Sequence, residues 1–290
     1  MRKLHLPLPD LRDARWFQLA GQATILAVGL SQLGFGVSPA QITAAIGAAL
    51  LTQWAGSLLL ATRFDWKSAV ITGLSLALLL RANDIWPFMC AALIAIGSKF
   101  AVRANDRHVF NPANIGIVVM AAFTDAAWTS TSEWGSALWF AALIAALGAL
   151  SCWRASRLDV PFIYLGVCAA LMIGRALYLG DPLAIPALRL THGALILFAF
   201  FMISDPKTTP EDPRTRALFV AAAAVIAYVL QFHFFISDGI FYAPAMLALA
   251  QLAMGRAGTG GVYEWGRPPR APAIGKLRFR QRGAPPAPAE

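Results

Sequence analysis

The sequence has little charge for its length. Only 13% of its 290 residues are Asp, Glu, Lys or Arg, whereas a soluble globular domain usually carries about 25%. Hydrophobic residues make up 58% of the chain, and the mean hydropathy is +0.60. This balance excludes an ordinary soluble domain and predicts an integral membrane protein that crosses the bilayer several times.

Cysteines and familiar catalytic motifs are also scarce. The three cysteines, Cys90, Cys152 and Cys168, lie apart within apolar runs, so their spacing predicts neither a disulfide framework nor a metal site. The sequence contains no Walker A motif, no dinucleotide fingerprint and no paired nucleophile and base. We therefore do not expect an independent hydrolase or a soluble dehydrogenase, and a role within a larger enzyme stays open.

Long apolar runs are abundant. A membrane-spanning helix needs about 20 such residues, and the sequence predicts an all-α membrane domain of about ten spans over residues 16–255. A basic arm precedes it at residues 1–15. The Gly-, Pro- and Arg-rich tail at residues 256–290 is expected to be disordered, because it cannot bury a core. The candidate spans are residues 16–36, 40–62, 67–82, 85–101, 111–127, 134–153, 159–178, 187–203, 215–232 and 238–255.

The basic residues favour one orientation of these spans. With ten spans and the N-terminus in the cytoplasm, 21 of the 24 Lys and Arg residues fall on the cytoplasmic side, all except Arg81, Arg175 and Arg189. Cytoplasmic loops are expected to carry this excess. Topology therefore explains the net charge of +9, and we expect no nucleic-acid partner. The prediction is a multi-pass protein of a bacterial-type plasma membrane with both termini in the cytoplasm.

Two basic polar segments interrupt the apolar pattern, and each contains an Asx-Pro pair. Asn111-Pro112 lies at the start of the fifth span, and Asp205-Pro206 follows the eighth. Asn and Asp are favoured helix N-caps, and proline is favoured at the next position, so both pairs predict helix starts. Helix N-termini with nearby cations can hold an anion. We expect the two pairs to approach one another and shape one cytoplasmic site; the alternative is that each only caps its own helix.

Four short motifs occur in order along the spans. They are Lys67-Ser68-Ala69-Val70-Ile71-Thr72-Gly73, Phe110-Asn111-Pro112-Ala113, Ser204-Asp205-Pro206 and Asp238-Gly239. Together they resemble the NqrB/RnfD family, which comprises the membrane B subunit of the sodium-pumping NADH:quinone reductase and the D subunit of the Rnf electron-transport complex. The first motif departs from the family pattern at Lys67, where relatives have Asn.

The resemblance implies ten helices in two related, pseudo-symmetric five-helix halves, similar to urea-channel folds. It also implies flavins and other membrane subunits of a redox complex as partners. Family members usually carry an FMN on a threonine in an S-G-A-T-like sequence between the fifth and sixth spans. Here that connection runs only from about Thr124 to Glu133; it contains Thr129 and Thr131 but not the motif. Covalent FMN is therefore not expected, and any FMN or riboflavin would bind non-covalently.

Two groups of residues are candidates for function. The Asx-Pro segments and the small polar residues beside them are candidates for binding a cofactor: Lys99, Asn111, Pro112, Asn114, Ser204, Asp205, Pro206 and Thr208. Polar and ionisable residues at membrane depth are functional candidates by default, and these are Ser68, Thr72, Arg189, His192 and Asp238. Arg189 and His192 are three positions apart and would share a helix face, although they could instead extend to the membrane interface.

Two functions agree with these observations. The chain is either a membrane subunit linked to electron transport and ion translocation, binding a flavin or quinone non-covalently, or a transporter or channel for a small solute or ion that uses the same fold without redox chemistry. Fold likeness does not decide between them. The lipid bilayer is the one partner that both require.

Overall fold

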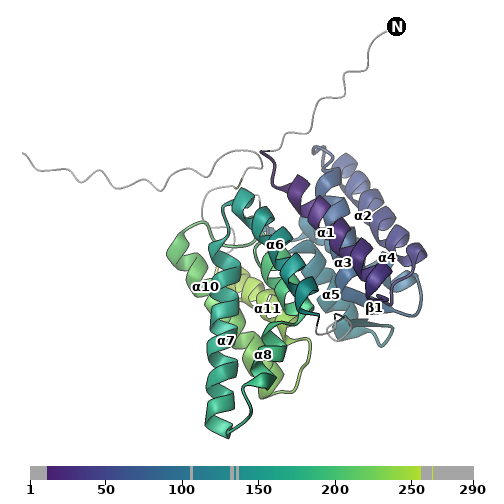
Figure 1. Ribbon diagram of the computed structural model, residues 1–290. Coiled ribbons are helices and arrows are strands. Elements are labelled where there is room, and N and C mark those ends of the chain that lie inside the picture. Colours follow the sequence, from purple (N-terminus) through teal and green to yellow (C-terminus); the bar gives the residue numbers. More distant parts are fainter. Residues whose placement is uncertain (1–11, 105–106, 131–133, 135–136, 256–262, 264–290) are drawn as a thin grey trace, which may run out of the picture.

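The computed structural model describes residues 12–104, 107–130, 134, 137–255 and 263 (Figure 1). The basic arm at 1–15 lies mostly outside these residues, and so does the tail at 256–290, whose predicted disorder stays a prediction. The helices are α1 (Arg15–Gln32), α2 (Pro39–Leu59), α3 (Trp66–Leu79), α4 (Trp86–Ala101), α5 (Pro112–Phe123), α6 (Leu138–Ala155), α7 (Asp159–Leu179), α8 (Ala184–Leu190), α9 (Gly193–Leu197), the π-helix η1 (Phe198–Met202), α10 (Pro213–Phe232) and α11 (Gly239–Ala253).

Each expected span coincides with a helix, and the eighth is broken. Its two parts, α8 and the continuous α9–η1, are bent by 47°. Among the described residues, four helices are long and apolar enough to cross a membrane, namely α2, α6, α7 and α10, and the bent pair adds a fifth. Four apolar helices are shorter: α3, α4, α5 and α11. The structure therefore supports a helical membrane protein with several spans, and the count of ten remains a prediction.

The expectation of an all-α chain is wrong in one detail. In the described part of the chain, two short antiparallel strand pairs join the helices: β1 (Leu80–Ala82) with β4 (Ala127–Thr129), and β2 (Arg103–Ala104) with β3 (Arg107–His108). β1 is buried throughout. The helices α3 and α5 are short, so the backbone that follows each of them lies within the protein. Buried backbone N–H and C=O groups must find partners, and β1 and β4 supply them to each other.

The packing order of the first five helices recurs in the second half. In the first half α1 packs on α3, α2 packs on α3 and α4, and α4 packs on α5. In the second half α6 packs on α9 and η1, α7 packs on α8 and α10, and α10 packs on α11. The halves meet where α1 contacts α6 and α5 contacts α11. Figure 1 shows the two groups side by side, in purple to blue and in teal to yellow-green. This order agrees with the two related halves that the resemblance implied.

Two helices are buried on all sides and form the centre of the molecule. Residues 72–79 of α3 are all buried, and so are residues 193–203 in α9, η1 and the following residue. A helix that is apolar all round belongs in a core. Close approach requires glycine here: a Cβ on Gly73 would lie 2.7 Å from the Ile46 Cα, and one on Gly148 would lie 2.4 Å from the Phe200 Cβ. The functional candidates lie at the ends of these central helices.

Candidate functional site at the junction of the two halves

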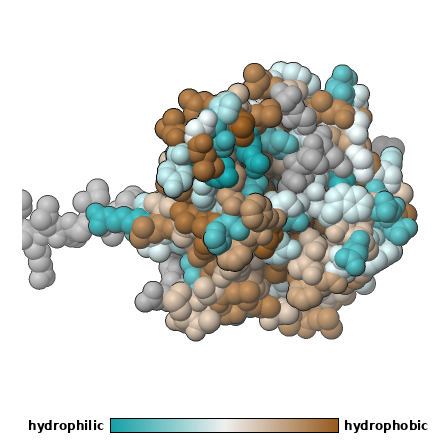
Figure 2. All heavy atoms as spheres, turned by 90° about the horizontal axis from the view of Figure 1, so that it is seen from below, coloured by the Kyte–Doolittle hydropathy of each residue, from teal (hydrophilic) through white to brown (hydrophobic). Residues whose placement is uncertain are grey.

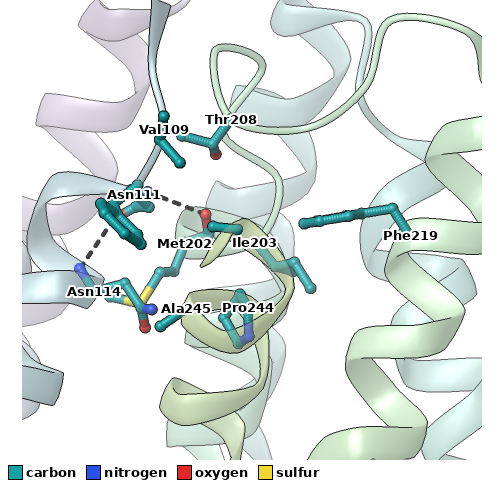
Figure 3. A pocket seen from close by; sticks show the side chains of 11 residues that line it. Val109, Asn111, Asn114, Met202, Ile203, Thr208, Phe219, Pro244 and Ala245 are labelled. Carbon is teal, nitrogen blue, oxygen red and sulfur yellow. Dashed lines mark hydrogen bonds between the residues drawn. The ribbon is translucent and has the colours of Figure 1, made fainter. Parts of the chain in front are cut away.

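Asn111 connects the two halves of the molecule. Its Oδ1 accepts a hydrogen bond from the Asn114 N–H at 3.1 Å and so caps α5, as the sequence predicted. Its Nδ2 donates to the Met202 carbonyl at 3.2 Å and to Asp205 Oδ2 at 3.3 Å. Figure 3 shows Asn111 directed towards Met202 at the end of η1. The predicted approach of the two Asx-Pro segments is confirmed; that they bind a ligand stays a prediction.

Asp205-Pro206 does not begin a helix, so that prediction was wrong. Asp205 Oδ1 accepts from the Lys207 N–H at 3.0 Å, which is an Asx-type turn within a loop. A helix starting at Pro206 would place Pro210 in its interior, where the missing N–H and the ring are costly. The next helix starts instead at a third Asx-Pro pair, where Asp212 caps α10 through the Thr215 N–H at 2.8 Å.

A contact between two partly buried ionisable side chains accompanies the Asn111–Asp205 bond. His108 Nε2 lies 3.9 Å from Asp205 Oδ2, an electrostatic contact rather than a hydrogen bond. Burial alone would raise the pKa of Asp205, but His108 and Lys207 outweigh it and hold the pKa below its ordinary value. Burial lowers the pKa of His108, and Asp205 offsets part of this shift. Asp205 is therefore ionised at neutral pH beside a histidine that releases its proton readily.

A polar cavity of about 50 Å³ opens beside this pair. A buried water occupies roughly 10–15 Å³ in this measure, so the cavity has room for a few waters or a small ion but not for a flavin ring. It brings together five of the candidates from the sequence, the expected nearby cations His108 and Lys207, and other residues that sequence reasoning missed. Its walls are Arg15, Gln18, Ser68, Ile71, Thr72, Ser75, His108, Asn111, Pro112, Ala113, Phe201, Asp205 and Lys207.

Lys99 lies next to this cavity through Ser68. Its ammonium donates to Gln53 Oε1 at 2.7 Å and to Ser68 Oγ at 3.0 Å. Thr72 Oγ1 donates to the Ser68 carbonyl at 2.9 Å, one turn earlier in α3. The Lys99 ammonium therefore contacts the first turn of α3, and Lys99 does not line the cavity itself. A cofactor-binding role for Lys99 remains a prediction.

The remaining cofactor candidates line two smaller cavities, each of about 20 Å³. Asn114 and Thr208 border the first, which is drawn in Figure 3. Asn114 is buried and donates to the Phe241 carbonyl at 2.9 Å, while its Oδ1 has no hydrogen-bond partner among the described residues. Ser204 and Pro206 border the second. Each cavity has room for about one water.

The other intramembrane candidates do not join this site. Arg189 and His192 were expected on one helix face, but α8 ends at Leu190 and α9 begins at Gly193, so the break separates them. Asp238 accepts a short hydrogen bond from the Thr129 hydroxyl. Thr129 follows α5, which Asn111 begins, so this contact lies at the opposite end of α5 from the site.

An ion-pair network that the sequence did not reveal holds the start of α1 against the start of α3. Asp13 Oδ2 lies 2.7 Å from Arg15 Nη2 and 2.9 Å from Lys67 Nζ, and Arg15 Nη1 lies 2.7 Å from Asp65 Oδ1. Burial alone would raise the pKa of Asp13, but Arg15 and Lys67 lower it to about 2. The Asp13-Ala-Arg15 spacing was visible in the sequence, whereas the partners at the start of α3 are 50 or more positions away.

Residues 131–249, from the segment before α6 into α11, match the model of the NQR2, RnfD, RnfE family. This chain is related to that family. The resemblance inferred from the motifs is thereby confirmed, and the matched range contains Asp205 and Asp238. The motifs at Ser68–Gly73 and Phe110–Ala113 lie before it. The match covers less than half of this chain, and the apolar helices agree with a membrane protein.

Two bacterial relatives are each named as the D subunit of an ion-translocating oxidoreductase complex. The protein of Citrobacter koseri is 36% identical over 93 residues, which are 31% of this chain and 26% of the relative. The protein of Escherichia coli O1:K1 is 30% identical over 112 residues, which are 38% of this chain and 30% of the relative. The match therefore spans less than a third of the length of these relatives.

Proposed function

We propose that this chain is a membrane subunit that works in electron transport and ion translocation, as the names of its relatives indicate for them. The observation that carries the proposal is the partly buried contact between Asn111 and Asp205. It joins a family-matched segment of the second half to the first half, and both residues line one polar cavity. Buried ionisable groups in a cavity are candidates for moving ions or protons.

A non-covalent FMN, riboflavin or quinone is the proposed redox ligand. Lys207 supplies a cation for a phosphate or a ring carbonyl at the mouth of the cavity, whereas Arg15 is already paired with Asp13 and Asp65. Because the cavity itself holds only about 50 Å³, the ring would lie over this mouth, against a partner subunit, and not inside it. We do not propose a covalent FMN. The Thr129 side chain is buried and its hydroxyl donates a hydrogen bond to Asp238, and Thr131 lies outside the described residues.

The second candidate function is transport of a small solute or ion without redox chemistry. The broken α8–α9 pair and the short helices α3, α5 and α11 favour it, because interrupted helices near the middle of a bilayer commonly line transport sites. A cavity for a few waters or one small ion suits this function directly. Both functions use the same residues, so activity alone in variants of Asp205 does not separate them.

The absorption spectrum of the purified protein separates the two functions. A redox subunit is expected to show the absorption bands of a flavin or quinone, and these bands should bleach on reduction. The ligand should separate from the chain on denaturation, because it is bound non-covalently. Binding of a chromophore at the proposed mouth is expected to be weaker in Lys207→Gln and unchanged in Arg214→Gln. Arg214 is an exposed cation outside the cavity. A colourless protein that carries solute across vesicle membranes would establish the transporter instead.

The proposed orientation has its own test. We propose a bacterial plasma membrane with both termini in the cytoplasm, because 21 of 24 basic residues then face inward. Cysteines introduced at Ser132 and Ala284 are expected to react with a membrane-impermeant reagent from opposite sides of the membrane. Labelling of Ala284→Cys from outside the cell would contradict this orientation.

A further inference from the structure

Two arginines contact one phenylalanine ring at the end of the molecule opposite the cytoplasmic site. The Arg175 guanidinium lies 5.0 Å from the centre of the Phe232 ring, and the Arg189 guanidinium lies 5.1 Å from it. They come from α7 and α8, and Phe232 ends α10. We call Arg175 and Arg189, which both lie against the ring of Phe232, the outer arginine pair.

The outer arginine pair keeps a net positive charge. Asp181 lies 3.4 Å from Arg175 and is the one carboxylate paired with either arginine among the described residues. Arg189 is exposed and has no carboxylate partner in the described part of the chain. A guanidinium at a membrane surface needs an anion or water, and its planar fork suits a phosphate.

Exposed apolar side chains surround this charge. Tyr178 is 89% exposed and Phe235 is 86% exposed. Leu177, Leu188 and Phe234 are also more than half exposed, on the ends of α7 and α8 and just after α10. Figure 2 views the molecule from this end, where hydrophobic side chains cover much of the face and hydrophilic ones form separate patches. We call these exposed apolar side chains the apolar rim. Exposure of so many large apolar side chains together is costly in water, whereas lipid chains can cover them.

The depth of Arg175 agrees with the position of a headgroup. Arg175 is the seventeenth residue of α7, which places it about 24 Å along the helix at 1.5 Å per residue. The hydrocarbon layer is about 30 Å thick, and a long arginine side chain reaches outward from its edge. We propose that the outer arginine pair binds the phosphate of an anionic phospholipid, whose chains lie against the apolar rim.

Binding of lipids to purified variants tests this proposal. The variant is R175Q/R189Q, and the matched control R63Q/R214Q removes two exposed arginines elsewhere. The unfolding midpoint is followed in neutral detergent as phosphatidylglycerol, phosphatidylcholine or inorganic phosphate is added. The native chain and the control are expected to be stabilised by phosphatidylglycerol alone. Loss of about fivefold in apparent affinity per arginine, or about 25-fold together, is expected in the variant.

Each other outcome overturns the proposal. Equal affinity in R175Q/R189Q and the native chain would mean that the lipid binds elsewhere. An equal loss in R63Q/R214Q would mean a general effect of charge, and an equal response to inorganic phosphate would mean that no lipid is required. If the double variant does not fold, R189Q alone carries the test, because Arg189 is exposed and has no carboxylate partner among the described residues. An unchanged affinity in R189Q would then reject the site.

Discussion

Removal of the Asn111 and Asp205 side chains, singly and together, tests whether the junction couples the two halves. Asn111→Ala removes the cap on α5 and two donated hydrogen bonds, to Met202 and to Asp205. Asp205→Ala removes that shared bond, the acceptor for the Lys207 N–H and the charge beside His108. The two variants therefore share one interaction.

The contacts set the expected size of each effect. Loss of an N-cap costs about 1 kcal/mol, and each lost hydrogen bond costs about 1 kcal/mol, so Asn111→Ala is expected to cost about 3 kcal/mol. Asp205→Ala removes an ionised acceptor of two bonds and is also expected to cost about 3 kcal/mol. The shared bond is long, 3.3 Å, so we expect the double variant to fall short of the sum by about 1 kcal/mol.

Reversible unfolding in detergent, followed by tryptophan fluorescence, measures the four stabilities of this cycle. The control cycle pairs Asn111→Ala with Asp212→Ala, which removes the cap of α10 in a separate segment of the chain. Those two effects are expected to add. A coupling below about 0.5 kcal/mol between Asn111 and Asp205 would refute the reasoning, because the two residues would then stabilise their own segments independently.

Three further predictions concern packing, pH and the cofactor. Gly73→Ala forces a Cβ against the backbone of α2 and should cost about 1–3 kcal/mol by thermal unfolding, whereas Gly97→Ala, with open space around it, should be neutral or stabilising. The pKa of His108 is held below 6.5 in the folded chain, so on acidification the unfolded chain takes up this proton first and the free energy of unfolding should fall below about pH 6.5. Asp205, whose pKa is held below 3.8, should add to the loss below about pH 3.8. In His108→Asn, the first part of this dependence of stability on pH should be flattened. A denaturing gel should show no flavin fluorescence, and a band that vanishes in Thr129→Ala would contradict the missing attachment site.

The sequence predicted most helix positions because long apolar runs report membrane spans directly. It also predicted that Asn111 caps a helix and lies near Asp205, from local capping chemistry and the symmetry of the pattern. It failed at Asp205-Pro206, where the later Asp212-Pro213 pair starts the helix instead. The clue was Pro210, which cannot lie inside a helix.

Other features of the site depend on contacts between distant parts of the chain. The break between Arg189 and His192 has no proline or glycine at its centre, so the helical period alone could not place it. The pairing of β1 with β4 and the ion pairs of Asp13 with α3 join segments that are roughly 50 positions apart. Such pairings follow from the burial of backbone and charge, which a single sequence does not display.

The central proposal is that this chain is a membrane subunit of a redox-linked ion-translocating complex. Affinity purification of the tagged chain from native membranes in mild detergent tests it most directly, with the protein composition and the visible spectrum recorded on the same sample. The account predicts that other membrane proteins purify with the chain and that the sample shows redox centres that bleach on reduction. A chain that purifies alone and colourless, yet carries a solute across vesicle membranes, would contradict it.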